Sequence, residues 1–368
     1  MQNSKPTKKT VVLGMSGGVD SSVAALLLKK QGYKVVGIFL RNYPDTEPYL
    51  DSICPFKGDK EIAERVCQKL NIPFRVIDYR KQYLKDVIEP MFKSYESGLT
   101  PNPDVCCNNL IKFPALWKFA KSISADFIAT GHYAQVKKTS KGFQLLSGKD
   151  KTKDQSYFLH ELTQSDLSHT IFPLGELTKS QVRKIAKSHK LKNWNKQGSR
   201  GVCFIGDLDF KSFLKKKIKK SLGVVLTPEG ETIGSHPGAF YFTIGERVRP
   251  NKGIEINDKY RNSIDNKKLY IAKKKGNTLI VVPEKSPLLL TKKVFIKNLK
   301  PINKKNFSKT GLRARIRHLG SLIPGKLKKE KSKYTFTFNK GIKEVASGQS
   351  IVLYKGKILI AAGIIKTQ

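Results

Sequence analysis

The stretch from residue 11 to residue 30, VVLGMSGGVDSSVAALLLKK, constrains the fold more than any other part of the chain. It opens with the apolar run 11–13, which is typical of a buried parallel strand. A glycine-rich turn covers residues 14–22, and the apolar residues after it predict a helix that ends near Gly32. Glycines let a backbone approach an anion closely, and the unpaired amides at a helix N-terminus attract negative charge. This order of elements therefore predicts a phosphate-binding site.

The residues of the turn exclude two common phosphate-binding motifs. A P-loop requires a lysine after its glycines, and the turn has none; its glycine spacing also differs from the dinucleotide-binding fingerprint. The run SGGVDS at residues 16–21 instead resembles the pyrophosphatase loop of ATP enzymes that split the bond between the α and β phosphates. That resemblance implies that ATP is a substrate, that pyrophosphate is released, and that a second substrate is activated as its adenylate.

Asp20 is unexpected in an anion site unless a metal ion accompanies the phosphates. A Mg²⁺ ion held between this carboxylate and the phosphates removes the conflict. The alternative is a simple Gly-Ser turn in which Asp20 only caps the helix. On the first interpretation, the predicted ATP-binding residues are Gly14, Met15, Ser16, Gly17, Gly18, Val19, Asp20, Ser21, Leu40 and Gly131.

Length and hydropathy set further bounds. A chain of 368 residues is too long for one hydrophobic core, so two or three domains are expected. The sequence has no apolar run of transmembrane length, and its first twelve residues have no apolar region of the signal-peptide type. We therefore expect a cytoplasmic protein that does not associate with a membrane.

The chain is strongly basic, with 70 Lys and Arg residues against 29 Asp and Glu residues and a formal charge of +41. Such a surface attracts nucleic acid. Lysine is scattered along the whole chain, so a compositional bias of the genome is an equally good explanation for the excess. Under either explanation, we expect binding to RNA that weakens steeply with salt.

The five cysteines are few and unevenly spaced, which argues against a disulfide scaffold. No Cys-x-x-Cys pair occurs, so neither zinc nor an iron–sulfur cluster is expected. Cys67 falls on an apolar helix face and is interpreted as a small buried hydrophobe. The role of Cys54 stays open. The remaining cysteines, Cys106, Cys107 and Cys203, are candidates for reactive thiols.

Strand and helix patterns alternate over the first 130 residues, which predicts an α/β fold with an open parallel sheet covered by helices on both faces. Ligands then bind at the carboxyl ends of the strands. The segment 100–109 is interpreted as a loop, because two prolines stiffen a turn just before two adjacent thiols. The expected strands are 11–13, 35–39, 74–77 and 127–130, and the expected helices are 23–31, 59–70, 83–95 and 113–122.

The pattern changes near residue 210. A basic amphipathic helix is predicted over 210–222, and short alternating strands separated by turn residues follow it to the C-terminus. We therefore expect three domains: an ATP-pyrophosphatase catalytic domain (1–210), a small β-rich central domain (211–285) and a C-terminal β-barrel (286–368). The expected strands are 223–226, 240–243, 268–272, 278–282, 294–296, 312–317, 334–338, 349–353 and 358–364.

Two cysteine-containing segments, NPDVCCN at 102–108 and GVCFIG at 201–206, closely resemble one family. It is the bacterial tRNA-specific 2-thiouridylase family, whose members replace O2 of the wobble uridine with sulfur. The resemblance runs from the first strand to the C-terminal barrel and implies an adenine nucleotide alpha hydrolase-like first domain. Further matching segments are GHYA at 131–134, KDQSYF at 153–158, FPLG at 172–175, FTIG at 242–245 and GQ at 348–349.

The resemblance assigns roles to single residues. Cys107 matches the family's first cysteine, the nucleophile that resolves the persulfide, while Cys106 stands where the family usually has an apolar residue. Cys203 matches the second cysteine, which carries sulfur as a persulfide and ends in a disulfide with Cys107. Asp104 is the implied acid/base near the target uridine.

The resemblance also implies partners. The substrate is tRNA with a wobble uridine, of the Lys, Glu and Gln types, and sulfur comes from a relay protein fed by a cysteine desulfurase. Three positions depart from the family: Gly198 to Arg200 before the second cysteine, Glu246 to Lys252, and His318. Arg200 places a cation beside Cys203, which favours a thiolate. The residues that match tRNA contacts are Asn102, Pro103, Asp104, His132, Lys153, Asp154, Gln155, Arg317, His318 and Gln349.

Two other functions are compatible with parts of the sequence. One is an adenylating enzyme with the same loop, of the amidotransferase or argininosuccinate ligase type, which needs neither paired thiols nor an RNA-sized basic surface. The other is an RNA-binding protein without catalytic activity. The intact loop at residues 16–22 argues against the second.

Overall fold

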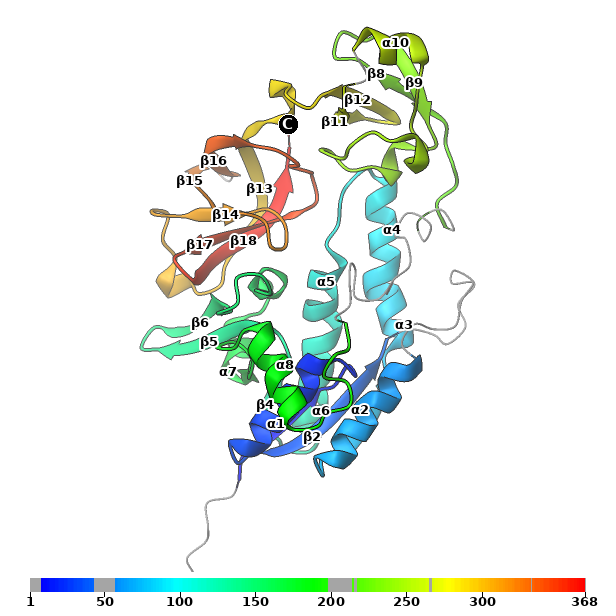
Figure 1. Cartoon of the computed structure of the whole chain (residues 1–368). Helices are drawn as coiled ribbons and strands as arrows, with labels where there is room; N and C mark the ends of the chain where they lie inside the picture. Colours follow the sequence, from blue (N-terminus) through cyan, green and yellow to red (C-terminus); the bar gives the residue numbers. More distant parts are fainter. Residues whose placement is uncertain are drawn as a thin grey trace, which may run out of the picture.

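The computed structural model describes residues 8–42, 57–197, 214, 217–264, 267–331 and 333–367. Figure 1 shows an α/β part built from the first half of the chain, a small β-rich part and a C-terminal β-barrel. Within the described residues, no helix is both long and apolar enough to cross a membrane. The segment around Cys54 and the segment 198–213, which includes Cys203, lie outside the described residues.

The α/β part is organised around a five-stranded parallel sheet with the order β3-β2-β1-β4-β7. Val12 pairs with Val36 of one neighbour and Ile128 of the other, so β1 lies inside the sheet. The glycine-rich turn leaves β1 at its carboxyl end, as predicted. The strands are β1 (Thr10–Gly14), β2 (Lys34–Arg41), β3 (Phe74–Asp78), β4 (Phe127–Ala129) and β7 (Thr170–Ile171).

Helices cover both faces of this sheet. Val11 and Leu13 pack with α1, α2 and α8 in one apolar cluster. Val12, which points to the opposite face, packs with Phe113 and Leu116 of α6. The predicted two-sided α/β sheet is therefore confirmed. These helices are α1 (Val19–Lys30), α2 (Lys57–Lys69), α6 (Phe113–Ser122) and α8 (Lys179–Ser188), and the short α7 (Gln164–Ser168) precedes β7.

Two helices of this part contain a π-helical turn. The helix expected over 83–95 is formed by α3 (Arg80–Tyr83), a π turn (Leu84–Ile88) and α4 (Glu89–Glu96). The segment 100–109, expected as a loop, is helical from Pro103 onward: α5 (Pro103–Cys106) continues through a second π turn (Cys107–Lys112) into α6. The loop prediction was wrong because Pro103 stands at the first helical position, where proline is tolerated, and Asn102 caps the helix through Val105 N.

The second sheet has the order β10-β9-β8-β12-β11. The strand expected at 240–243 was wrong, because residues Ala239–Tyr241 form a 3-10 turn after Gly238, whose φ is +145°. The helix expected over 210–222 lies mostly outside the described residues. The elements here are β8 (Gly223–Leu226), β9 (Thr232–His236), β10 (Glu255–Ile256), α10 (Asp258–Ser263), β11 (Leu269–Lys275) and β12 (Thr278–Pro283).

The third sheet has the order β13-β16-β15-β14-β17-β18-β6-β5, and an additional pairing of β13 with β18 closes six of its strands into the predicted barrel. Its last two strands are a hairpin from the α/β part, joined through Ile358 and Leu146. The strands are β5 (Ala134–Thr139), β6 (Gly142–Ser147), β13 (Thr291–Pro301), β14 (Arg313–Arg315), β15 (Ile323–Glu330), β16 (Lys333–Ile342), β17 (Ser350–Lys355) and β18 (Ile358–Lys366).

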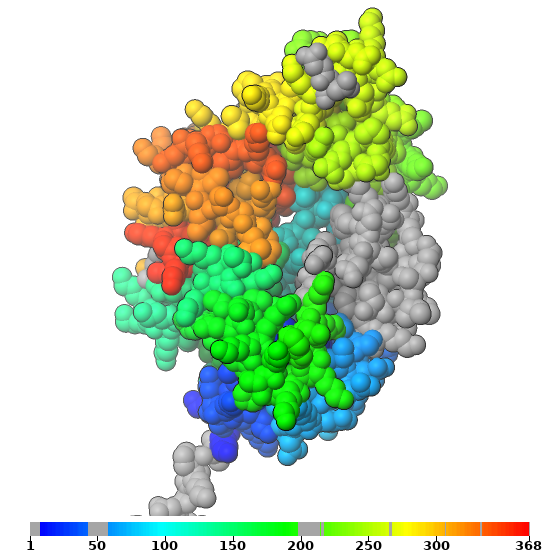
Figure 2. Space-filling view, viewed as in Figure 1, coloured from blue at the N-terminus to red at the C-terminus, as the bar shows by residue number. Residues whose placement is uncertain are grey.

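The barrel and the α/β part meet along this hairpin. In the space-filling view of Figure 2, the orange and red barrel lies directly against the green segment that contains β5 and β6. The apolar residues at this junction form one cluster, in which Leu145 of β6 packs with Val352, Tyr354 and Leu359 of the barrel. Sheet pairing and apolar burial therefore both join the two parts.

A buried ion pair adds to this junction. Arg315 Nη1 of β14 lies 2.6 Å from Asp154 Oδ2, and the two side chains are 8% and 2% exposed. The other carboxylate oxygen of Asp154 accepts hydrogen bonds from the amides of Gly148 and Ser156. The Ser156 hydroxyl lies 3.0 Å from the hydroxyl of Tyr354 in the barrel. Polar bonds as well as sheet pairing therefore fix the barrel against the α/β part.

We expect Asp154→Ala to lower the free energy of unfolding by about 3–5 kcal/mol, because the guanidinium group of Arg315 is left buried without its counter-charge. Glu344→Ala is the matched control: it removes the partner of Arg317 in a more exposed ion pair and should cost less than about 1 kcal/mol. Urea unfolding followed by circular dichroism measures both. Equal losses would show that burial adds nothing to the Asp154–Arg315 pair.

Candidate active site

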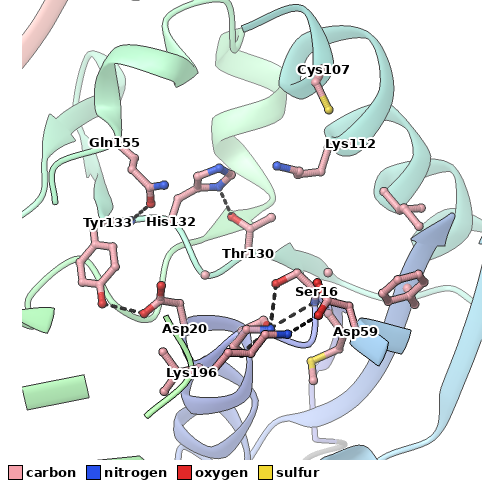
Figure 3. Close-up of a pocket in the computed structure, with 18 of the residues that line it drawn as sticks. Ser16, Asp20, Asp59, Cys107, Lys112, Thr130, His132, Tyr133, Gln155 and Lys196 are labelled. Carbon is pink, nitrogen blue, oxygen red and sulfur yellow. Dashed lines mark hydrogen bonds and ion pairs between the residues drawn. The ribbon is translucent and has the colours of Figure 1, made fainter. Parts of the chain in front are cut away.

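A cavity of about 1200 Å³ opens at the carboxyl ends of β1, β2 and β4, where a parallel sheet is expected to bind ligands (Figure 3). It is lined by every predicted ATP-binding residue except Gly17, and by Cys107. Four predicted tRNA contacts, His132, Lys153, Gln155 and His318, line it as well. One cavity therefore joins the predicted nucleotide loop, a predicted catalytic thiol and residues predicted to meet tRNA.

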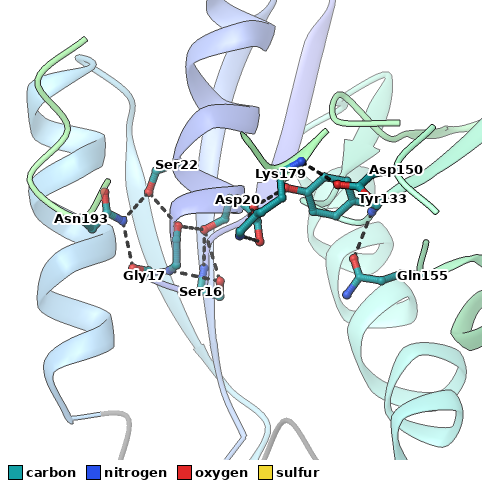
Figure 4. Close-up of polar contacts among 11 residues, drawn as sticks. Ser16, Gly17, Asp20, Ser22, Tyr133, Asp150, Gln155, Lys179 and Asn193 are labelled. Atoms are coloured by element: carbon teal, nitrogen blue, oxygen red, sulfur yellow. Dashed lines mark hydrogen bonds and ion pairs between the residues drawn. The ribbon is translucent and has the colours of Figure 1, made fainter. Parts of the chain in front are cut away.

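Hydroxyl groups hold the nucleotide loop in shape. The Ser21 hydroxyl accepts a hydrogen bond from Ser16 N at 3.2 Å, and Ser22 Oγ donates to Gly18 O at 2.9 Å. Asn193 also supports the loop, since its Nδ2 donates to Gly17 O at 3.0 Å and to Ser22 Oγ at 2.9 Å (Figure 4). No motif in the sequence pointed to Asn193, which follows α8 and lies far along the chain.

Gly17 and Gly131 let the chain approach itself closely around the loop. Gly17 has φ +71°, and a Cβ there would lie 2.3 Å from the carbonyl oxygen of Asp59. A Cβ at Gly131 would lie 3.0 Å from Ser21 N. Any larger residue at either position has to move backbone, which explains why glycine is present at both.

Gly18 is the N-cap of α1, and no side chain caps this end of the helix within the described residues. The alternative interpretation of Asp20 as the helix cap is therefore wrong. Amides at an uncapped helix N-terminus keep their hydrogen-bonding capacity for another acceptor. Together with the helix dipole, this arrangement suits a phosphate group.

Asp20 instead bonds to a cation and a phenol. Lys179 Nζ lies 2.7 Å and 2.6 Å from the two carboxylate oxygens, and the Tyr133 hydroxyl donates to Oδ1 at 2.8 Å (Figure 4). Burial and the adjacent Asp20 charge raise the pKa of Tyr133 above its usual range, which keeps this hydroxyl a donor. Lys179, at the start of α8, was not predicted from the sequence.

The Mg²⁺ ion expected at Asp20 stays a prediction, and the side chains as arranged do not fit it. Both oxygens of Asp20 face the ammonium group of Lys179, and a cation at the same place would be repelled. Asp59, another acid in the cavity, pairs with Lys196. No group of three or more metal-binding side chains occurs among the described residues. In this arrangement Lys179 is the cation beside Asp20.

Cys107 lies at the other end of the cavity, and its side chain points into it (Figure 3). It is 9% exposed, and burial raises the pKa of its thiol to about 11. His132 lies nearby and is buried, which lowers its pKa well below 6.5, and its Nδ1 lies 2.8 Å from Thr130 Oγ1. At neutral pH the site therefore contains a thiol and a neutral imidazole.

Two residues of the motif that precedes the thiols form the N-terminus of α5. Pro103 is buried at the first turn of α5, and Asn102 caps it. Asp104 is half-buried in the same turn and is not one of the residues that line the cavity. Cys106 is also half-buried, while Cys107 faces the cavity, so the structure separates the two adjacent thiols.

The predicted tRNA contacts do not all lie together. Gln155 Oε1 accepts a hydrogen bond from Tyr133 N at 3.0 Å, and the His318 ring packs on Phe158 with ring centres 4.3 Å apart. Burial lowers the pKa of His318 to about 4, so this ring is uncharged at neutral pH. Asp154, Arg317 and Gln349 do not line the cavity: Asp154 is buried in its ion pair, and Arg317 pairs with Glu344.

Comparison with known proteins provides independent evidence. Residues 9–207 match the family described as tRNA methyl transferase HUP domain, residues 211–283 its PRC-barrel domain, and residues 289–365 the aminomethyltransferase beta-barrel domain. The tRNA-specific 2-thiouridylase MnmA 1 of Geobacillus kaustophilus is 40% identical over 97% of this chain and 95% of its own length. The chain belongs to the tRNA-specific 2-thiouridylase family.

Other members of this family give the same result. The protein named tRNA-specific 2-thiouridylase MnmA from Oceanobacillus iheyensis is 39% identical over 100% of this chain and 97% of its own length. The one from Nitrosomonas europaea is 40% identical over 97% of this chain and 98% of its own length. The family predicted from the two cysteine segments is therefore confirmed.

We expect Gly17→Ala to weaken ATP binding at least about tenfold, because a displaced loop loses at least one charge-assisted hydrogen bond to phosphate. Gly32→Ala is the matched control, since Gly32 also has positive φ, +87°, but nothing lies within 4 Å of its added Cβ. Gly32→Ala should lose about 1–2 kcal/mol of stability because of its positive φ, and Gly17→Ala should lose more, because its Cβ also meets the backbone of Asp59. Isothermal titration with ATP separates them, and equal ATP affinity in the two variants would contradict this role of Gly17.

Proposed function

We propose that the chain is a tRNA-uridine 2-sulfurtransferase, which uses ATP to replace O2 of the wobble uridine with sulfur and releases AMP and pyrophosphate. The observation that carries this proposal is one cavity that joins the nucleotide loop, Cys107 and four residues matched to tRNA contacts, His132, Lys153, Gln155 and His318. The names of the full-length relatives support the same activity.

The first half-reaction activates the uridine. The N-terminus of α1 and the amides of the loop bind the phosphates of ATP, and uridine O2 attacks the α phosphorus while pyrophosphate leaves. The cations that line this part of the cavity, Lys179, Arg183 and Lys196, offset the charge of the phosphates. Lys179 reaches the phosphates only by exchanging part of its contact with Asp20, so the Asp20–Lys179 pair holds it ready.

The second half-reaction transfers sulfur to the activated uridine. Cys203 carries a persulfide received from a relay protein. The terminal sulfur attacks C2 of the activated uridine, and AMP leaves with O2. The thiolate of Cys107 then attacks the Cys203 sulfur, the sulfur–sulfur bond to the uridine breaks, and 2-thiouridine is released with a Cys107–Cys203 disulfide. A cellular thiol must reduce that disulfide before the next turnover.

The remaining assignments complete the proposal. Asp104 acts as acid/base near the uridine, and the substrates are wobble-uridine tRNAs of the Lys, Glu and Gln types. The uncharged ring of His318 contacts the tRNA as an aromatic surface rather than as a cation. The catalytic, central and tRNA-binding domains cover 1–210, 211–285 and 286–368, and the reaction takes place in the cytoplasm.

We expect AMP release from ATP to depend on added tRNA, and Asp20→Ala to lower its rate at least about tenfold, because Lys179 loses its charged anchor. Asp258→Ala, which removes an exposed acid of α10, is the matched control. Radiolabelled ATP and an unmodified tRNA transcript measure the rate. AMP release without tRNA would indicate another acceptor, and an unchanged rate in Asp20→Ala would leave Asp20 with a structural role.

We expect Cys107→Ser to abolish formation of 2-thiouridine, and Cys106→Ser to retain most of it, because only Cys107 of the two lines the cavity. Cys203→Ser should be as inactive as Cys107→Ser, since carrier and resolving thiol act as one unit. Mass spectrometry of nucleosides from treated tRNA measures the product. If Cys107→Ser still made 2-thiouridine and lost it only when Cys106 was also changed, the assignment of the resolving thiol would be wrong.

A further inference from the structure

The turn that carries Cys107 is π-helical and spans Cys107–Lys112. In an α-helix, residues four apart share a face, whereas a π turn bonds residue i to residue i+5 and brings residues five apart together. Cys107 and Lys112 are separated by this spacing, and both line the cavity. The π turn therefore places one lysine on the same side of the helix as the thiol.

Lys112 is held in this position by a chain of two hydrogen bonds. Its Nζ donates to Asn108 Oδ1 at 3.0 Å, and Asn108 Nδ2 donates to the carbonyl oxygen of Phe158 at 3.2 Å. Asn108 is 3% exposed, so its amide cannot turn away to water. Figure 3 shows the ammonium group of Lys112 between Cys107 and His132. This lysine belongs to the cavity wall, unlike a solvated surface lysine.

We propose that Lys112 is a positioning residue for sulfur transfer, whose ammonium group stabilises the thiolate of Cys107. The assignment rests on the proposed function, because it takes Cys107 to be the resolving thiol. A thiol buried to this degree has only a small thiolate fraction to attack a persulfide even with Lys112 nearby, and loss of that charge lowers the fraction further.

The charged and titratable groups around Cys107 support this assignment. Burial is the largest influence on its pKa, followed by Lys112, which lowers it, while Asp104 and Cys106 raise it. Tyr83 and His132 line the same cavity. Among these groups Lys112 is the cation. Its charge also lowers the pKa of His132, in the same direction as burial, so His132 does not compete as a second positive charge.

Alkylation of Cys107 by iodoacetamide tests the proposal without ATP, tRNA or a sulfur donor. The parent protein carries Cys106→Ser, so that the peptide analysed by mass spectrometry contains Cys107 as its one thiol. Three changes are compared in it: Lys112→Met, which is neutral; Lys112→Gln, which is neutral but still able to donate to Asn108; and Lys112→Arg, which keeps the charge. Lys118→Met is the control for net charge, because Lys118 lies exposed on α6.

We expect Lys112→Met and Lys112→Gln to slow alkylation of Cys107 by about three- to fourfold at every pH from about 7 to 9. Lys112→Arg should react at the rate of the parent. A rise of one pKa unit lowers the thiolate fraction about tenfold, and the greater nucleophilicity of the more basic thiolate returns part of that loss. In urea, where the site is unfolded, all variants should react at one rate.

Two results would overturn the proposal. If Lys112→Gln kept the parent's alkylation rate while Lys112→Arg did not, the hydrogen bond to Asn108 would control the reactivity of Cys107 and the charge would not. If Cys107 were alkylated at the parent's rate in both Lys112→Met and Lys112→Gln, Lys112 would have no influence on the thiol. If the unaltered protein did not form 2-thiouridine, the proposed function would be refuted. The alkylation rates would still show whether Lys112 acts on Cys107, so the two proposals can fail separately.

Discussion

The buried contact between Asp154 and Arg315 is the interaction on which the arrangement of the site depends. The two residues belong to different parts of the chain, and their pairing fixes the barrel against the α/β sheet. The hairpin β5–β6, which continues the barrel sheet, follows Gly131–Tyr133 at the edge of the cavity. As a result, His318 of the barrel lines a cavity whose floor is the nucleotide loop. Loss of this contact would weaken the junction that holds His318 over the nucleotide loop, while the pairing of β6 with β18 and the shared apolar cluster would remain.

Charge balance explains how the nucleotide end of the cavity tolerates an acid. An unpaired carboxylate facing a triphosphate would repel it, but Asp20 is neutralised by Lys179 and receives a hydrogen bond from Tyr133. The two other cations near this end of the cavity, Arg183 and Lys196, add positive charge beside the loop. Much of the chain's positive charge is spread over its surface, whereas these few residues place it in the cavity beside the loop proposed to bind phosphates.

Features that local patterns encode could be predicted from the sequence. The alternation of apolar strands and helices was visible, because it depends on neighbouring residues. The choice of Cys107 over Cys106 came from the family resemblance, and of these two residues Cys107 lines the cavity. Contacts between distant segments were not visible: Lys179 with Asp20, Asn193 with Gly17, and the joining of β6 to β18. The same limit applies to Asp154, whose match to a tRNA contact gave no hint of a buried partner 161 residues away.

A buried thiol with a pKa of about 11 is slow to react with oxidants, since only the thiolate is strongly nucleophilic. For a resolving cysteine this is useful, because it must wait through ATP cleavage and sulfur loading without being oxidised. The same property would prevent the last step unless the persulfide were held close enough to offset the low thiolate fraction. Proximity and a fixed cation act together here: the first raises the frequency of attack, and the second raises the fraction of Cys107 that is able to attack. The helix that carries the thiol supplies the cation, because its π turn directs Cys107 into the cavity and sets Lys112 on the same side.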